Sequence, residues 1–221
     1  MSLPVIAVTN VATCVNDEQV AGVIPALQRQ VSADFKAYWN RECCLVFVAK
    51  EQTVPDGWWQ IVVMDDPDQA GALGYHELSA RGMPLGKVFA RLDLEAGASW
   101  TVTLSHELLE MLADPWVNWC AESAGKVYAL EVCDPVEADK LGYEVDGVLL
   151  SDFVTPAWFG GTGEMDFMRR VSRALELGAE GYISVLDAAK GWVQTSGAEV
   201  PVGSRRWRRG MERGQWRRSE R

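Results

Sequence analysis

Short apolar runs and helical periodicities alternate along the first hundred residues of the chain. PVIAVTNVA, CCLVFVAKE and WWQIVVMDDP are rich in apolar and β-branched residues and lie between turn signals, so they predict buried strands. After the first run, apolar residues recur at steps of three or four and predict one helix face: Val20, Ile24, Leu27, Val31, Phe35 and Tyr38. This helix would begin near Asn16-Asp17, and Pro25 inside it predicts a kink or a later start. GKVFARLDL alternates between apolar and polar residues and predicts a further strand.

The second half of the chain combines one strong helical pattern with several strands. Residues from about Ala98 to Ala113 predict a helix that ends at Asp114-Pro115. KVYALEVCDPVE predicts a strand that runs into a turn, YEVDGVLL predicts a hairpin, and GYISVLD and GWVQT predict late strands. VTPAWFGGTG and DDPDQAGALG are typical of loops, and the moderate helical period of MDFMRRVSRALEL leaves its structure open. The mixture favours an α+β (mixed α/β) fold.

The helix predicted around SHELLEMLADP separates an apolar stripe from a group of ionisable residues. On a helix that turns about 100° per residue, four apolar residues form one stripe: Leu104, Leu108, Met111 and Leu112. His106 and Glu110 lie one turn apart and roughly opposite that stripe, and Glu107 borders them. Two ligands one turn apart can hold one cation, with Glu107 as the general base for a metal-bound water. The alternative is an exposed charged helix face, because glutamate is a common helix former.

A second acidic group follows in LEVCDPVEAD and offers further metal ligands. Glu131 and Asp134 flank Cys133 at the end of a predicted strand, where the chain changes direction and side chains can converge. Either carboxylate is a candidate third ligand. Cys133 can also bind a metal, although a single cysteine is more often a small core residue.

His76, in LGYHEL, is the other histidine of the chain. Its candidate catalytic roles are to line a cleft, to orient a ligand or to stabilise an oxyanion, against a purely structural hydrogen bond. The donor set of the whole group suits one divalent ion. Carboxylate oxygen is an acceptable zinc ligand, and a glutamate in the second position extends the choice to manganese or calcium.

Composition and charge narrow the class of protein. The 221 residues are 48% hydrophobic, which is ample for a core, and no run of 18 apolar residues predicts a membrane span. Five cysteines without a C-x-x-C pair argue against a disulfide framework or an all-cysteine zinc site and favour a reducing compartment. The start of the chain lacks the pattern of a secretion signal.

The net charge of −10 hides two electrostatically different parts. The last 18 residues, SRRWRRGMERGQWRRSER, carry eight Arg and two Glu, which is +6 and leaves −16 on the rest. We therefore divide the chain into a globular domain over residues 1–203 and a basic Arg/Trp-rich tail over residues 204–221. Residues 205–221, from Arg205 to Arg221, could bind an acidic partner, such as another subunit or nucleic acid, or could be a solvated end.

Four segments of the chain together resemble a family of uncharacterised proteins from bacteriophages and bacterial genomes: SHELLEMLADPW, YALEVCDPVEAD, GYEVDGVLLSDFVTPAWF and ALGYHEL. The shared order is H-E-x-x-E-x-x-x-D-P, then E-[VI]-C-D, then a Phe-rich proline loop, over residues 71–159. That family is similar to zincin-type metallopeptidases that carry a glutamate in the second ligand position. The chain departs from the usual zincin pattern because it has no second histidine on the helix and no third histidine after Pro115.

The resemblance implies a zincin-like single domain, in which an active-site helix packs on a mixed sheet. It implies His106 and Glu110 as ligands, Glu107 as base, and Glu131 or Asp134 as the third ligand. PLGKVFARL would be the edge strand along which a protein or peptide substrate pairs.

Two functions follow from this resemblance: a zinc peptidase-like hydrolase of phage origin, or a zincin-fold structural or assembly protein of a virion with little or no catalysis. The expected location is the host cytoplasm or the virion. A protein that binds small molecules or nucleic acid is a third reading, and the acidic body argues against a broad nucleic-acid surface.

Overall fold

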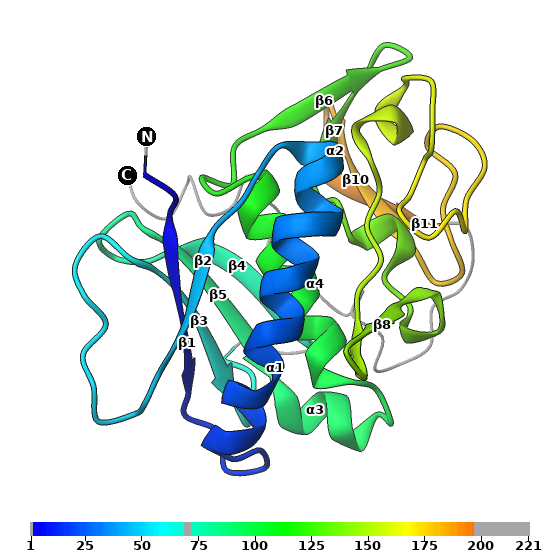
Figure 1. The fold of residues 1–221 in the computed structure, drawn as a ribbon. Helices are drawn as coiled ribbons and strands as arrows, with labels where there is room; N and C mark the ends of the chain where they lie inside the picture. The colour runs from blue at the N-terminus through cyan, green and yellow to red at the C-terminus, as the bar shows by residue number, and fades with distance from the viewer. Residues whose placement is uncertain (1, 69–71, 197–221) are drawn as a thin grey trace.

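Five strands form the larger sheet of the protein, in the order β2-β1-β3-β5-β4. The computed structural model describes residues 2–68 and 72–196. The strands are β1 (Val5–Asn10), β2 (Cys44–Val48), β3 (Trp59–Met64), β4 (Gly74–Leu78) and β5 (Pro84–Phe89). β1, β2, β3 and β5 run parallel, and β4 is antiparallel to β5 at one edge (Figure 1).

The apolar runs of the sequence become the inner strands of this sheet. Ile6, Ala7 and Val8 of β1 are fully buried, as expected for a parallel strand that is covered on both faces. The three strands predicted from the first apolar runs are confirmed. The strand predicted from GKVFARLDL is only partly right, because β5 ends at Phe89 and a short helix, α3 (Ala90–Glu95), follows directly.

A long helical segment connects β1 to β2. α1 (Asp17–Arg29) begins where the sequence predicts it, with a capping box between Asn16 and Gln19 that satisfies free amides of the first turn. The helix continues through a π-helical segment (Gln30–Phe35) into α2 (Lys36–Trp39). Pro25 lies inside α1, so the later helix start is wrong. α1 packs against β1 and β2.

The helix α4 (Trp100–Ala113) lies at the centre of the molecule. Every one of its residues is buried, the ionisable ones included, so the alternative of an exposed charged face is wrong. α4 packs against β3, β4 and β5 of the large sheet, and also against α3 and the hairpin strand β9. The predicted helix is therefore confirmed, but it has protein on its polar side as well.

The rest of the described chain folds into small sheets and short helices. A four-stranded antiparallel sheet has the order β11-β10-β7-β6, with strands β6 (Cys120–Ser123), β7 (Lys126–Ala129), β10 (Tyr182–Asp187) and β11 (Gly191–Ser196). β8 (Tyr143–Val145) and β9 (Val148–Leu150) form the predicted hairpin. Three short 3₁₀ helices are η2 (Asp134–Val136), η3 (Asp139–Leu141) and η4 (Pro156–Phe159). MDFMRRVSRALEL contains no helix.

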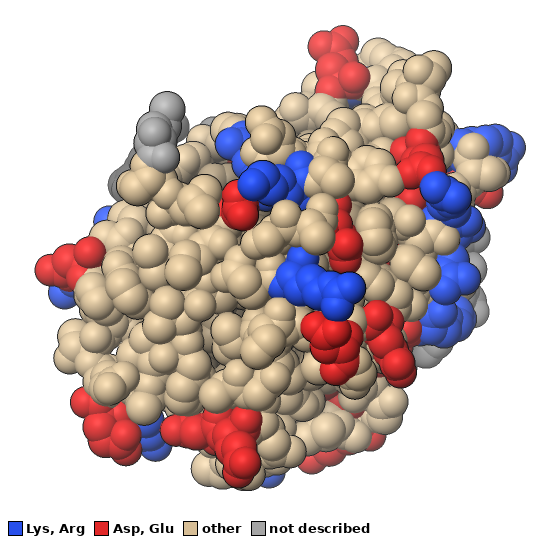
Figure 2. Space-filling model, in the orientation of Figure 1, with Lys and Arg blue, Asp and Glu red and all other residues tan. Residues whose placement is uncertain are grey.

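The described residues are therefore a mixed α+β protein with few helices, and one hydrophobic core joins the two larger sheets. No helix among them is long and apolar enough to cross a bilayer. On the face drawn in Figure 2, acidic and basic side chains form small groups with broad areas of other residues between them. The proposed tail, residues 204–221, and the boundary at residue 203 lie outside the described residues.

Candidate metal centre

His106 lies in the middle of α4 and faces two carboxylates. Its Nε2 is 3.2 Å from Oε1 of Glu110, one turn along the same helix, and 3.2 Å from Oδ1 of Asp134 at the start of η2. All three side chains are almost completely buried. An imidazole Nε2 carries at most one hydrogen, and one hydrogen cannot point well at two oxygens. A cation between the three atoms would satisfy all of them.

Asp134 reaches this position because the segment before η2 runs past α4. The amide of Cys133 donates a hydrogen bond to Oε1 of Glu110 (3.2 Å), which joins the two segments directly. On the other side, the amide of Gly178 donates to the carbonyl of Pro135 at 2.8 Å. A β-carbon at position 181 would overlap that same carbonyl, so Gly181 allows the chain before β10 to pack against η2.

His76 lies on β4 and faces the other side of the same group of glutamates. Its Nδ1 is 3.6 Å from Oε2 of Glu107 and 3.7 Å from Oε2 of Glu110, and its Nε2 is 4.0 Å from Oε2 of Glu131. These distances are longer than ordinary hydrogen bonds of about 2.7–3.2 Å. The side chain of His76 is only 3% exposed. A buried imidazole is thus surrounded by three carboxylates, none in direct hydrogen-bond contact with it.

The close approach of β4 to α4 depends on Gly74. A β-carbon at this position would lie 2.8 Å from Oε1 of Glu107 and 2.8 Å from Cγ2 of Thr103. The missing side chain therefore lets the backbone of β4 pass directly over Glu107. This contact holds the carboxylate of Glu107 between strand and helix, beside His76.

The electrostatics of the cluster reflect several carboxyl groups that share one buried space with two histidines. Burial and then the charge of Asp134 raise the pKa of Glu110 to about 7, against the opposing effect of His106. Burial by itself lowers the pKa of His76, but the neighbouring carboxylates of Glu107, Glu131 and Glu110 raise it above its ordinary value. Both directions follow from several negative groups that share a buried space, which a bound cation would relieve.

The donor atoms fit a divalent metal. Two ligands on a tetrahedral zinc ion, each bound at about 2.0–2.2 Å, lie about 3.3–3.6 Å apart, close to the 3.2 Å separations around His106. Potential ligand atoms of His106, Glu110 and Cys133 all lie within 4.8 Å of one another. Burial raises the pKa of the Cys133 thiol well above its ordinary value, so Cys133 would have to lose its proton to a bound metal.

The structure brings together every residue that the sequence singled out, in a definite arrangement. Asp134 lies beside His106, whereas Glu131 lies beside His76, so the two candidate third ligands occupy different sides of Glu110. Cys133, which the sequence alone leaves open, joins the first side. No local pattern in the chain indicates on which side of Glu110 each of these two acidic residues lies.

The expectation that PLGKVFARL forms an edge strand is wrong. PLGKVFARL provides β5, which is an inner strand between β3 and β4. β4 forms the edge of this sheet, and it carries His76. β4 is not predicted from the sequence, because GYHEL is short and its polar residues obscure the alternation of buried and exposed positions.

Comparisons of the chain with protein-family models, with curated proteins and with solved structures gave no match. The resemblance carried by SHELLEMLADPW and YALEVCDPVEAD therefore stays a prediction. Any assignment of function rests on the geometry of the buried cluster.

Proposed function

We propose that this protein is a metal-dependent hydrolase of the peptidase type, built on a zincin-like core, with zinc as its metal. The observation that carries the proposal is the approach of Glu110 and Asp134 to the same ring nitrogen of His106, with 3.2 Å between Nε2 and each carboxylate oxygen. The sequence H-E-x-x-E places two of these ligands one helical turn apart, and the third comes from a separate segment. This division of ligands is the usual design of a catalytic zinc site with three protein ligands.

The residues of the chain divide the work in this proposal. His106, Glu110 and Asp134 hold the ion, and Cys133 is close enough to be an additional ligand. A zinc ion held by these residues would supply Lewis-acid chemistry: it would polarise a carbonyl and lower the pKa of water from about 15.7 to about 7. Glu107 would accept the proton in this proposal, because it is the buried carboxylate that directly follows the ligand His106 on α4.

His76 supports the reaction from β4. With its Nδ1 3.6 Å from Oε2 of Glu107, it can orient that carboxylate and stabilise negative charge on a substrate oxygen. β4 is one of the two edge strands of the large sheet, and an extended peptide can add to such an edge by main-chain hydrogen bonds. The substrate class that fits this edge is therefore a protein or peptide.

One observation favours a second candidate, a zincin-fold structural or assembly protein of a virion. His106, Glu107 and Glu110 are 0% exposed. Structural zinc sites are closed, whereas catalytic sites keep one position open. In this alternative the metal stabilises the fold, and other subunits bind elsewhere, for instance through Arg205–Arg221.

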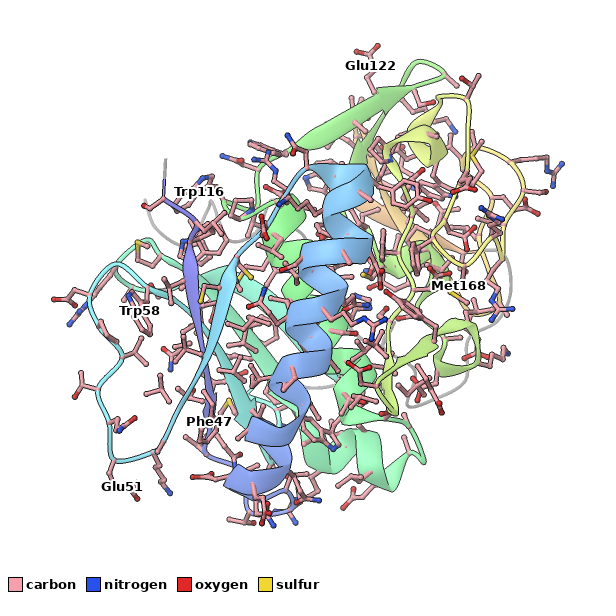
Figure 3. All side chains as sticks on the ribbon, viewed as in Figure 1. Phe47, Glu51, Trp58, Trp116, Glu122 and Met168 are labelled. Atoms are coloured by element: carbon pink, nitrogen blue, oxygen red, sulfur yellow. The ribbon has the colours of Figure 1, made fainter. Side chains whose placement is uncertain are left out.

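Glu107→Gln separates these candidates. We expect the purified wild type to hold zinc by elemental analysis and to cleave a fluorogenic peptide library, and the variant to keep the metal while its rate falls about 10²–10⁴-fold. Glu122→Gln is the matched control, since Glu122 points away from the body of the molecule on β6 (Figure 3). A wild type that holds zinc without cleaving any member of the library would support the structural candidate instead.

A further inference from the structure

The ligand groups around Glu110 form two sets rather than one. The first joins His106, Glu110 and Cys133, and the second joins His76, Glu110 and Glu131. In each set, one potential ligand atom of every residue lies within 4.8 Å of the others. Glu110 is the residue common to both.

The two oxygens of Glu110 face in different directions. Oε1 lies 3.2 Å from Nε2 of His106 and accepts the amide of Cys133, whereas Oε2 lies 3.7 Å from Nδ1 of His76. A carboxylate oriented in this way can bind one cation with each oxygen. Sites with two metal ions about 3.5–4 Å apart commonly use such shared ligands.

His76 provides an independent indication that the second set binds something. Its side chain is 97% buried, and neither ring nitrogen has a hydrogen-bond partner. Burying an imidazole without partners is costly, so such a group is rare in a folded protein unless a ligand completes it. Both nitrogens face carboxylates, which is the environment of a histidine that shares a cation with them.

The geometry points to a second divalent-cation site formed by His76, Glu131 and Oε2 of Glu110, next to the first site, so that Glu110 bridges two ions. One imidazole and two carboxylates suit zinc or manganese. The rival explanation is an imidazolium ion that is held between glutamates with no second metal. The inference rests on the proposed function, because it takes the ion at His106 as the first of the pair.

Both sites can be counted with the metal alone. The full-length protein is stripped with chelator and dialysed against Zn²⁺, and the bound ions per chain are measured by elemental analysis. We expect two ions for the wild type and for the control Glu122→Gln, and one ion for His76→Leu and Glu131→Gln. Glu131 is 12% exposed in its side chain, so Glu131→Gln keeps the test open if His76→Leu does not fold.

A spectroscopic measurement tests the bridge itself. Two Mn²⁺ ions about 3.5–4 Å apart are magnetically coupled, so the paramagnetic resonance spectrum of the Mn²⁺-loaded wild type should show a coupled pair. Glu131→Gln should show isolated ions, and Glu122→Gln should keep the coupled spectrum.

The possible results distinguish this inference from the proposed function. One ion in the wild type, lost in His106→Gln and kept in both second-site variants, overturns the second site and leaves the proposed function standing. One ion that is lost in His76→Leu and kept in His106→Gln overturns both the proposed first site and the pair. No bound ion overturns both, and a second ion that survives in His76→Leu and Glu131→Gln lies elsewhere and overturns the inference.

Discussion

His106 Nε2 lies 3.2 Å from Oδ1 of Asp134, which joins the middle of α4 to the first residue of η2. The same nitrogen is equally close to Oε1 of Glu110. In the proposed first site, the contact between His106 and Asp134 favours Asp134 as the third ligand. Glu131, the other candidate, is on the His76 side.

Asp134→Asn should weaken zinc binding strongly. The amide removes one negative charge and one good ligand oxygen, and we expect a loss in affinity of at least about 10–100-fold. Competition with a chromogenic zinc chelator measures this. Asp146→Asn is the control, because Asp146 is an exposed residue of the β8–β9 turn that pairs with Arg29. Unchanged affinity in Asp134→Asn would exclude Asp134 as a ligand.

Removal of the metal should lower the thermal stability of the protein. A ligand present at 100 times its Kd stabilises the folded state by about 2.7 kcal/mol, which corresponds to roughly 5–11 °C in Tm for a domain of this size. Differential scanning fluorimetry with Zn²⁺ and with EDTA checks this. His106→Gln should show a smaller difference between the two conditions than the wild type, because it loses a ligand of the first site. A wild type with the same Tm in both would contradict a metal centre.

The replacement Gly74→Ala should destabilise the protein. The added β-carbon would meet Glu107 and Thr103 at 2.8 Å, and overpacking of this kind costs about 1–3 kcal/mol. Chemical denaturation measures the free energy of unfolding. Gly22→Ala is the matched control, because Gly22 lies in α1 with nothing within 4 Å of an added β-carbon. There the change should be neutral or stabilising by up to about 1 kcal/mol. Equal losses at the two positions would argue against a tight contact of β4 with α4.

The pH dependence of stability should contain a contribution from Asp152. Burial, together with the hydrogen bond and the charge of Asp166, raises the pKa of Asp152 to about 9. Its Oδ1 accepts hydrogen bonds from the amides of Phe153 and Met168. The folded state thus holds a proton on this carboxyl that the unfolded state releases at a much lower pH.

The free energy of unfolding should fall as the pH rises, because the folded state keeps a proton that the unfolded state has lost. A carboxyl whose pKa is raised by folding stabilises the protein fully below its unfolded pKa of about 3.9, and this stability is lost as the pH rises toward about 9. The loss is at most about 1.4 kcal/mol per pH unit. Asp152→Asn keeps a neutral donor toward Asp166. This variant should therefore flatten the decline in the free energy of unfolding between about pH 5 and 8, which lies between the two pKa values. An unchanged slope would show that Asp152 is ionised in the folded protein.

The sequence alone could predict α4 and the residues that it places at the site. The apolar stripe of Leu104, Leu108 and Met111 and the stop at Asp114-Pro115 are local signals, and both are present in the structure. The pairing of His106 with Glu110 needs only the helical repeat. The helix α4 and the His106–Glu110 pair therefore depend only on residues close to them in the sequence.

Other parts depend on contacts between distant segments and were not readable from a local pattern. β4 forms because GYHEL pairs with β5, and the alternation of GKVFARLDL does not reveal that the strand ends at Phe89. The side of Glu110 on which Glu131 and Asp134 lie is set by the path of the chain from β7 into η2. The burial of the polar face of α4 likewise comes from β4, which precedes it in the chain, and from the segment of Asp134, which follows it.

The packing of Gly181 against Pro135 has a consequence for how the protein is made. A ribosome delivers the large sheet and α4 first, since both end by Ala113, before the segment that carries Asp134. The segment that carries Asp134 acquires its backing only after the glycine before β10 has left the exit tunnel. During translation the helix can therefore form with two of its ligands while the third has no fixed position. Loading of the proposed metal ion would therefore follow the emergence of the segment before β10.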